Sequence, residues 1–585
     1  MTITLHQLNS CTASHFVELL SGIYEHSPWI PQRAEVQRPF VSLAALKIAM
    51  QQVVAQASGQ EQLGLICEHP DLAGAAALSG ELTPESTGEQ SQVGLLNCSP
   101  EQLDVISALN SAYRARFGFP FIIAVKGPDG RGLKRNDIIS AFMRRVKNQR
   151  AEELSECLQQ INRIAEMRLN DLFNVTLEFG NDIMAQAEVI GSWSDEAVGL
   201  TCAFLTPAHR KTANQLAEWM CAAGMQVSID AIGNVVGRYL SDQPDAKTLI
   251  TGSHYDTVCN AGKYDGREGI LLAIAVVRHL HARGEKLPYH LEVIGFSEEE
   301  GVRFKSTFLG SNAVIGKFDL SLLDKTDAAG VVMREALTEA GHDVSCIAAI
   351  ARNPQDILGF VEVHIEQGPV LLQKNLPVGI VSSIAGSSRF LVEFTGVASH
   401  AGTTPMDMRK DAAVAAAEII LFIEKRCAMV AALVGTVGQL QVPEGSVNVI
   451  PQRCVFSMDI RAADNLVREA AVAAILQQID TVCQRRGIEF SINKIIDIPA
   501  VQCAPWLMNQ LQRATENAGV PVVVLPSGAG HDAMAMANIT DVAMLFTRCG
   551  NGGISHNPLE TMTADDAELS AQIFLDFLRQ LKPQA

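Results

Sequence analysis

The residues best suited to catalysis stand in a loop sequence near the middle of the chain. His254 follows an apolar, β-branched run at residues 248–251, and Asp265 comes eleven residues after His254 in a glycine-rich stretch. The run predicts a buried strand, so both side chains are expected just past its carboxyl end, where open α/β sheets bind ligands. Histidine and carboxylate are transition-metal ligands. A purely structural His–Asp pair is the alternative, and three further segments favour a metal site.

The first of these segments is acidic. Glu298, Glu299 and Glu300 follow a strand-like run at residues 291–295, so they also stand at a strand end. Three adjacent carboxylates repel one another, and a cation would remove that cost. A carboxylate beside a metal can also act as the base that deprotonates water. A solvated acidic loop is the other interpretation of this run.

The other two segments add histidines. Alternation in the apolar run at residues 360–368 places Glu362, His364 and Glu366 on one face of a predicted strand. A glycine-rich loop follows another apolar strand and ends at His556. Glycines there would let the backbone approach a ligand closely.

Together these segments supply two histidine-containing half-sites that can share one carboxylate, a pattern suited to two Zn²⁺ or Mn²⁺ ions. The candidate ligands are His254, Asp265, Glu300, His364 and His556. From about residue 177 onward, the chain resembles the dimetal amidohydrolases of the aminoacylase and carboxypeptidase clan. It is most similar to the subgroup acting on carbamoyl and ureido groups, because related peptidases carry a carboxylate where this chain has His364.

The same subgroup, which includes allantoate amidohydrolase and N-carbamoyl-amino-acid hydrolases, is matched by motifs at residues 399–405, 448–451, 459–461 and 528–533. The resemblance implies that His254, Asp265 and His364 hold one metal, and that Asp265, Glu300 and His556 hold the other. It implies that Glu299 is the general base and that Gln367 contacts substrate. Asp256 is expected to orient His254 through a hydrogen bond.

Further polar residues fit substrate binding. Arg461 ends a predicted strand, and its guanidinium could bind a substrate carboxylate, with a surface salt bridge as the alternative. Asn448 and His400 could stabilise the oxygen that becomes negative in a tetrahedral intermediate. His531 either contacts substrate or caps the helix that follows it. The family resemblance implies that His400 is supplied by a neighbouring subunit, so we expect a homodimer, with a small-residue helix face at residues 412–417 as a possible contact surface.

The first 173 residues follow a different pattern, because helical periodicity dominates them. Runs at residues 42–55 and 100–117 predict helices, and a long amphipathic helix ends the segment. In that last helix Arg168 lies on the apolar face. A buried cation needs a partner, so Arg168 should meet either a structural carboxylate or an anionic ligand.

Three motifs in this segment, at residues 69–74, 86–95 and 116–122, resemble 2-oxo-4-hydroxy-4-carboxy-5-ureidoimidazoline (OHCU) decarboxylase. The resemblance implies that His69, Glu89 and Arg168 form the catalytic and substrate-binding set. The further contacts that it implies are Ser86, Gln90, Phe121 and Ile122. No cofactor is expected, because charge left by carboxylate loss can spread into the substrate's own ring.

We therefore expect an all-α N-terminal domain (residues 1–173) followed by an α/β dimetal hydrolase. The hydrolase would comprise residues 177–376 and 496–585, with an inserted α/β lid, or dimerisation, domain at residues 377–495. A net charge of −18 argues against nucleic acid as a partner. No run is apolar and long enough for a membrane, and an N-terminus without a signal-like pattern, with 13 unpatterned cysteines, favours a cytoplasmic protein.

These features predict a bifunctional enzyme of ureide catabolism that decarboxylates OHCU to (S)-allantoin and hydrolyses allantoate to ureidoglycine, ammonia and CO₂. Two alternatives stay open. The hydrolase could act on N-carbamoyl-L-amino acids or ureidoglycolate, and the helical domain could be a non-catalytic interaction module.

Overall fold

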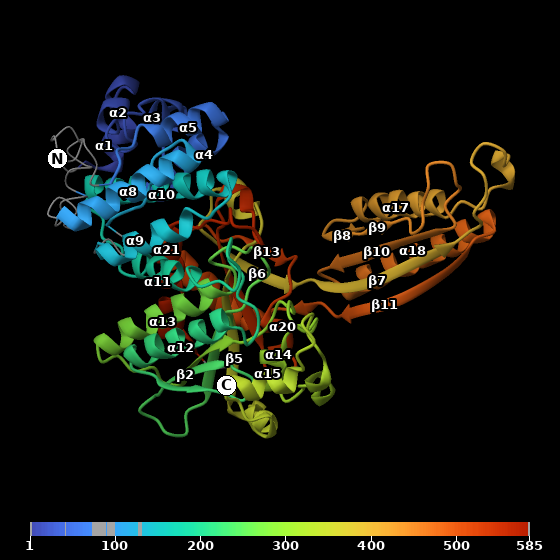
Figure 1. Ribbon diagram of the computed structural model, residues 1–585. Helices are drawn as coiled ribbons and strands as arrows, with labels where there is room; N and C mark the ends of the chain where they lie inside the picture. Colours follow the sequence, from blue (N-terminus) through green and yellow to red (C-terminus); the bar gives the residue numbers. More distant parts are fainter. Residues whose placement is uncertain (1–2, 41, 73–88, 90–99, 127–131, 583–585) are drawn as a thin grey trace. The chain divides into compact units, whose positions relative to one another are not determined.

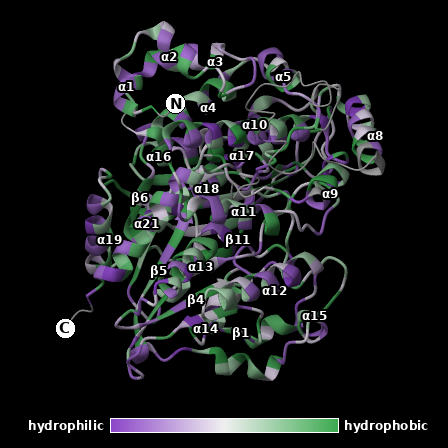
Figure 2. Ribbon diagram, turned by 90° about the vertical axis from the view of Figure 1, so that its left-hand side faces the viewer, coloured by the Kyte–Doolittle hydropathy of each residue, from purple (hydrophilic) through white to green (hydrophobic). Residues whose placement is uncertain are grey.

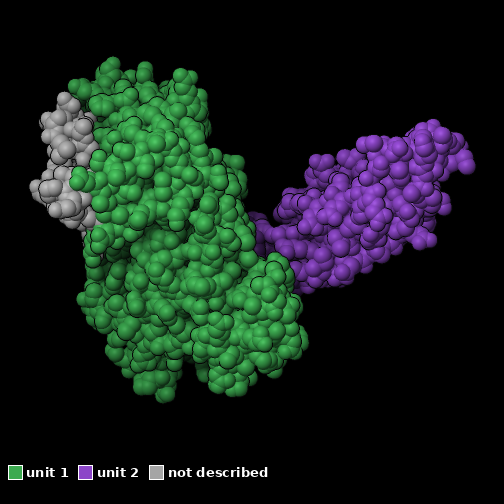
Figure 3. Space-filling model, in the orientation of Figure 1, with its two compact units in different colours: residues 1–379, 509–522, 544–585 green, residues 380–508, 523–543 purple. Residues whose placement is uncertain are grey.

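The structure, a computed structural model, describes residues 3–40, 42–72, 89, 100–126 and 132–582 (Figure 1). These residues form two compact units, which Figure 3 colours separately. Unit 1 comprises Met1–Gly379, Asn509–Val522 and Met544–Ala585, and unit 2 comprises Ile380–Met508 and Val523–Ala543. Unit 1 thus holds both the N-terminal helical region and most of the predicted hydrolase domain. The predicted domain boundaries stay a prediction.

The regular secondary structure described in the N-terminal region of unit 1 is helical, with loops such as residues 120–124 between the helices. Its α-helices are α1 (Leu5–Ser10), α2 (Ala13–Leu19), α3 (Trp29–Ala34), α4 (Leu43–Gln56), α5 (Gly59–Cys67), α8 (Pro100–Phe117), α9 (Arg135–Arg145) and α10 (Arg150–Phe173). The predicted runs at residues 42–55 and 100–117 correspond to α4 and α8. Side chains from Ile3 to Leu169 form one apolar core within this region.

The rest of unit 1 is built around a mixed sheet with both parallel and antiparallel pairs of strands. Its strands are β1 (Gln226–Ile229), β2 (Val235–Tyr239), β3 (Thr248–His254), β4 (His290–Phe296), β5 (Ile357–Ile365) and β14 (Val542–Thr547). They lie in the order β1-β2-β4-β3-β5-β14. β3 runs parallel to both β4 and β5, so the carboxyl ends of these three strands lie at one edge. That edge is the predicted location of the site.

Helices cover this sheet. They are α11 (Gly180–Gly191), α12 (Pro207–Ala222), α13 (Arg267–Ala282), α14 (Leu309–Val314), α15 (Met333–Glu339), α16 (Val370–Lys374) and α21 (Ala564–Gln580). α13 is apolar on most of its surface and packs on β3 and β5. α12 carries both hydrophilic and hydrophobic residues along its length (Figure 2), as expected for a helix with one buried face.

Unit 2 contains an antiparallel sheet in the order β11-β7-β10-β8, with β9 paired to β10. Its elements are β6 (Val378–Ile384), β7 (Gly386–Thr395), α17 (Ala412–Ala428), β8 (Leu433–Thr436), β9 (Leu440–Gln441), β10 (Arg453–Ala462), α18 (Asn465–Arg486), β11 (Glu489–Ile498), β12 (Val501–Gln502), β13 (Val524–Ser527) and α20 (Asp532–Met536). The helix α19 (Pro505–Asn517) begins in unit 2, and most of its residues belong to unit 1. Apolar residues of β7 and β10 pack against α17 and α18. Ala412 and Ala416 are buried in this core, so these two members of the small-residue face at residues 412–417 are not available to another subunit, whereas Ala417 is exposed.

Candidate functional site

The carboxyl ends of β3, β4 and β5 bring the predicted metal ligands together. His254 is the last residue of β3, Glu299 and Glu300 follow β4, and His364 lies next to the last residue of β5. Asp265 stands just before α13. Because these strands are parallel neighbours, residues that are far apart in the sequence meet at one edge.

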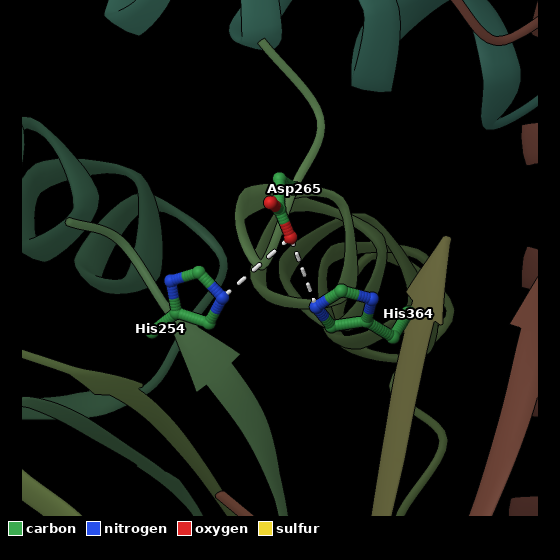
Figure 4. A group of neighbouring side chains, drawn as sticks. All are labelled: His254, Asp265 and His364. Atoms are coloured by element: carbon green, nitrogen blue, oxygen red, sulfur yellow. Dashed lines mark ion pairs between the residues drawn. The ribbon is translucent and has the colours of Figure 1, made fainter. Parts of the chain in front are cut away.

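Asp265 lies between the two histidines of the first predicted half-site (Figure 4). Its Oδ1 atom is 3.7 Å from Nε2 of His254 and 3.4 Å from Nε2 of His364. All three side chains are buried. Two imidazole nitrogens directed at one carboxylate oxygen form a donor set that suits Zn²⁺ or Mn²⁺.

The other oxygen of Asp265 serves the second half-site. Its Oδ2 atom is 3.0 Å from Nε2 of His556, and that nitrogen is 3.3 Å from Oε1 of Glu300. Ligand atoms within each of the two sets, His254–Asp265–His364 and Asp265–Glu300–His556, lie within 4.8 Å of one another. Asp265 thus belongs to both candidate ligand sets, and these residues fit a dimetal centre.

Hydrogen bonds fix the orientation of the two buried histidine rings. Nδ1 of His364 lies 2.8 Å from the carbonyl oxygen of Ile365. Nδ1 of His254 lies 3.2 Å from the carbonyl oxygen of Asp256 and 3.3 Å from its carboxylate. In both rings Nε2 is therefore the nitrogen that faces Asp265. The predicted contact between Asp256 and His254 is present.

Asp256 also positions the acidic segment. Its two carboxylate oxygens accept the backbone N–H groups of Glu299 at 3.1 Å and of Glu300 at 3.2 Å. The Glu299 side chain is 9% exposed, and its carboxylate shares a third candidate ligand group with His254 and Glu300. A single aspartate thus contacts both a candidate metal ligand and the segment of the predicted base.

The site concentrates negative charge. Burial, with repulsion from Asp265, raises the pKa of Glu300 to about 7. Burial and the same repulsion raise the pKa of Glu560, which lies beneath the site, to about 7. A bound cation would favour the ionised carboxylates and reverse this trend.

Gln367 is adjacent to the same carboxylate. Its side-chain amide donates to both oxygens of Asp265 at 3.0 Å and lies 3.3 Å from Nε2 of His556. The predicted contact residue is therefore at the candidate metal site.

Two other acidic residues of this region have structural partners. Glu362 accepts a hydrogen bond from Oγ of Ser253 at 2.7 Å. Glu366 was expected on the same strand face, but β5 ends at Ile365, and Glu366 instead accepts the backbone N–H groups of Val370 and Leu371 at the start of α16. That part of the prediction is wrong, because the need to cap a helix end overrides the strand alternation.

Unit 2 holds the remaining hydrolase residues of the prediction. An isolated bridge joins His400 to Val449, next to Asn448, and both His400 and Asn448 are exposed. Arg461 donates to Asp459 on its own strand, at 3.0 Å for the shortest contact, and to the carbonyl oxygen of Gly528 at 2.9 Å. The surface salt bridge considered for Arg461 is therefore present, with the side chain 30% exposed.

His531 occupies the N-cap position of α20, but its side chain makes no capping hydrogen bond. Its Nε2 atom lies 2.8 Å from Oγ of Ser527, and the ring is buried. The capping role considered for this histidine is therefore not the one it has.

In the helical region, Arg168 forms the centre of a second buried site. Its Nε and Nη2 atoms donate to the two oxygens of Glu89 at 2.9 and 3.0 Å. Its Nη1 atom donates to Glu25 at 2.9 Å and to the carbonyl oxygen of Gly22 at 3.0 Å. Burial disfavours the charged guanidinium, but the two carboxylates outweigh burial and raise the pKa of Arg168.

His69 lies in the field of the same charges. Burial lowers its pKa to about 4, although Glu25 and the carbonyl oxygen of Leu65, 2.9 Å from Nδ1, act to raise it. Phe121 and Ile122 are buried, and the Ile122 carbonyl oxygen accepts a hydrogen bond from Arg145 at 2.6 Å. The predicted contacts Ser86 and Gln90 lie outside the described residues.

Comparisons with known proteins agree with this division of the chain. The sequence profile of the OHCU decarboxylase family matches residues 9–170. The profile of peptidase family M20/M25/M40 matches residues 250–580, more than half of the chain. The chain belongs to peptidase family M20/M25/M40. The predicted pairing of a decarboxylase-family segment with a hydrolase-family segment is confirmed.

Individual relatives in this family cover the C-terminal part of the chain. "Allantoate deiminase 1" of Glycine max is 38% identical over 443 residues, which are 70% of this chain and 91% of the relative. "N-carbamoyl-L-amino acid amidohydrolase" of Geobacillus stearothermophilus is 37% identical over 66% of this chain and 93% of its own length. A hydantoinase/carbamoylase-family amidase structure from Burkholderia multivorans is 30% identical, with a TM-score of 0.64 over 69% of this chain and 98% of that chain.

Sequence reasoning missed two glutamates of these sites. Glu560 accepts the backbone N–H groups of Tyr264 and Asp265 at 2.8 and 3.2 Å, and Oγ of Ser555 donates to Glu560 at 2.7 Å. Glu25 is the second carboxylate on Arg168. Neither glutamate stands in a recognisable motif, so only the tertiary fold reveals them.

Proposed function

We propose that the chain is a bifunctional enzyme of ureide catabolism. The helical region decarboxylates OHCU to (S)-allantoin without a cofactor. The M20-family region hydrolyses allantoate to ureidoglycine, ammonia and CO₂ with two divalent ions, Mn²⁺ or Zn²⁺. The observation that carries the hydrolytic half is Asp265, whose two oxygens face different histidine sets.

In the hydrolase, the metal pair would be held by His254, His364, Asp265, Glu300 and His556. Bound there, the ions would polarise the ureido carbonyl and lower the pKa of water. Glu299 takes the proton of the attacking water and transfers it to the nitrogen whose bond to the ureido carbon breaks. Arg461 binds the substrate carboxylate, and Gln367 and His531 contact the substrate.

In the helical region, Arg168 and Glu89 act as a pair. Arg168 holds an anionic group of the substrate, Glu89 accepts ring N–H bonds, and His69 handles the proton that replaces the lost carboxylate. Because its pKa is about 4, the His69 imidazole is neutral at pH 7, so His69 would relay a proton between its two ring nitrogens and not donate it as an imidazolium. Ser86, Gln90, Phe121 and Ile122 are the further substrate contacts of this proposal.

Two alternatives have support of their own. The Geobacillus relative is named for N-carbamoyl-L-amino acids, so such compounds, and ureidoglycolate, are competing substrates for the hydrolase. The donors of Arg168 already meet Glu89, Glu25 and a carbonyl oxygen, which is the pattern of a structural ion pair, so the helical region could be a non-catalytic module.

The deciding experiment uses the full-length protein loaded with Mn²⁺ or Zn²⁺. Ammonia release is measured with allantoate, ureidoglycolate and a set of N-carbamoyl-L-amino acids, and decarboxylation is followed with freshly prepared OHCU. Allantoate should have the highest kcat/KM. A higher kcat/KM for another ureide would replace the substrate assignment, and no acceleration of OHCU decay would support the non-catalytic module.

The proposal includes a homodimer formed through unit 2, in which His400 of one subunit joins Asn448 in stabilising the anionic intermediate of the other. The exposure of His400 supports a role outside its own unit's core. Mixing inactive His400→Ala and Glu299→Gln proteins under conditions of subunit exchange should restore part of the activity. No recovery after proven exchange would place His400 in its own subunit's site or outside catalysis.

A further inference from the structure

Helix α10 has two faces that belong to different halves of unit 1. Its apolar residues, such as Leu158 and Ile161, pack in the core of the helical region. A second stripe, at steps of three and four residues, is polar. Its members are Glu156, Gln159, Arg163, Glu166 and Asn170. A polar stripe on an amphipathic helix normally faces water, but this one contacts the M20-family region.

The C-terminal half of the stripe is fixed by buried polar contacts. Nη2 of Arg163 donates to Asn181 of α11 at 2.8 Å. Nζ of Lys47 in α4, a side chain 1% exposed, donates to both Asn170 and Asp565 of α21 at 2.6 Å. In Figure 1, α10 accordingly runs between α4 and the pair α11 and α21. Buried, mutually satisfied polar groups hold their elements in one arrangement.

The N-terminal half of the stripe meets the loop that carries Asp265. Lys263 is two residues from this bridging carboxylate, and its Nζ atom is 2.9 Å from Glu188 of α11 and 3.7 Å from Glu156 of α10. The stem of Lys263 passes directly over Gly191, where an added Cβ atom would lie 2.9 Å from Cγ of Lys263. The Lys263 side chain is therefore held at its charged end by the two glutamates and along its stem by the contact with Gly191.

The next residue of the stripe meets the loop that carries His556. Nε2 of Gln159 donates to the carbonyl oxygen of Pro558, two residues from that histidine, at 3.4 Å. Glu560 joins the two loops through its hydrogen bonds to Tyr264, Asp265 and Ser555. α10 thus contacts both loops beside residues proposed to bind metal.

We propose that Glu156 and Gln159, which belong to the decarboxylase-family segment, are positioning residues for the dimetal centre of the hydrolase. They act through Lys263 and Pro558 on the loops of Asp265 and His556, so α10 serves both halves of the protein. The inference rests on the proposed dimetal hydrolase. Its basis is that a bridging ligand must be held to within about 0.5 Å of its working position.

The test measures metal binding directly. Full-length wild-type protein and the double variant Glu156→Gln/Gln159→Ala are equilibrated with buffered free Mn²⁺ and Zn²⁺, and bound metal per chain is determined. The half-saturating free metal concentration should rise about threefold to tenfold. This rise is smaller than the loss of metal affinity, about 10–100-fold, that is typical when a residue bonded directly to a metal ligand is removed. Glu156 and Gln159 are not bonded to a ligand but act through Lys263 and Pro558.

A matched control lies on the same helix. Asp171→Asn removes an ion pair with Lys126, 2.6 Å long, that stays within the helical region. It should leave metal binding unchanged. The single variant Glu156→Gln should produce most of the rise in the half-saturating metal concentration. Glu156→Asp keeps the charge but is too short to reach Lys263, so it should show the same rise. Thermal unfolding and OHCU decay show that each variant is folded.

Binding curves that coincide for wild type and the double variant would overturn the proposal, as would an equal shift in Asp171→Asn. The reciprocal measurement is hydrogen exchange, because any coupling must work in both directions. Metal loading should slow exchange of α10 amides in wild type and less in Glu156→Gln. A protein that binds two ions but does not hydrolyse allantoate would refute the substrate assignment alone. A protein that binds no metal would refute the dimetal centre and this inference with it.

Discussion

The two candidate sites balance buried charge in opposite ways. In the helical region Glu89 and Glu25 face a cation supplied by the protein itself, the guanidinium of Arg168. In the hydrolase region the side-chain contacts described for Asp265 and Glu300 are to histidines, an amide and a hydroxyl, and no lysine or arginine side chain is among them. The charges of the first site are balanced by protein groups, whereas the proposed function adds cations to balance those of the second.

This difference extends to pKa values. The carboxylates of the helical region raise the pKa of Arg168, so the charged form of its guanidinium is favoured there. In the hydrolase the pKa of Glu300 rises to about 7, because burial and a like charge oppose its ionisation. The contrast indicates that metal removal should affect one activity only, and the following experiments test that contrast in order of expected effect.

The largest effect is expected for Asp265→Ala, because Asp265 serves both half-sites. Hydrolysis should fall below about 10⁻⁴ of wild type, since both ions depend on this carboxylate for position and charge. Bound metal should fall below two ions per chain, as measured by elemental analysis. Decarboxylation should stay close to wild type. Full metal stoichiometry in Asp265→Ala would contradict the bridging role.

A somewhat smaller loss is expected for Glu299→Gln, which keeps the shape of the side chain and removes the base. Hydrolysis should fall about 10²–10⁴-fold, the range typical of general acid–base groups. Metal content should stay near normal, because Glu299 is not among the proposed ligands. Loss of metal together with activity would show that Glu299 is itself a ligand.

Arg168→Ala tests the other side of the comparison. Removing the cation from beside Glu89 and Glu25 should abolish decarboxylation and destabilise the protein by about 3–5 kcal/mol, the usual cost of breaking a buried ion pair. Calorimetric unfolding measures the loss. Arg168→Lys is the matched control, since it keeps the charge but cannot make the two-pronged contact with Glu89, and it should retain more stability than activity. Normal decarboxylation by Arg168→Ala would remove Arg168 from the catalytic set.

The sequence could predict those parts of the sites that depend on local pattern. His254 and His364 are identifiable because each stands near the end of an apolar run, and parallel strands bring such ends together. Asp265 is identifiable from the glycine-rich stretch that follows His254. Glu560 is not, because it acts on backbone N–H groups almost three hundred residues earlier. Glu366 was assigned to the strand face because alternation cannot show where a strand ends.

The helical region shows the same limit. Periodicity placed Arg168 on a buried face and required a partner, but could not decide between Glu25 and a ligand. It also cannot distinguish a polar stripe that faces water from one that faces another domain. The stripe of α10, with Arg163 bonded to Asn181, is of the second kind. None of the described helices is both long and apolar enough to cross a bilayer.

The smallest and most specific effect concerns pH. Burial lowers the pKa of His69 to about 4, so the folded protein keeps this imidazole neutral where a free histidine, with a pKa of about 6.5, is already protonated. Protons then bind preferentially to the unfolded chain, so the stability contributed by His69 is complete above pH 6.5 and declines as the pH falls toward 4.

The rate of decarboxylation should therefore stay nearly constant from pH 7.5 to about 5 and decrease only as the pH approaches the pKa of His69 in the folded protein. Hydrolysis in the same samples should decrease earlier, because protons compete with metal for histidine ligands. The test is to measure the rates of both reactions across this pH range, with His69→Gln as the reference for decarboxylation. A half-maximal decarboxylation rate near pH 6.5 that disappears in His69→Gln would show that His69 titrates like an exposed histidine, and the two sites would then not differ in the way their buried charges suggest.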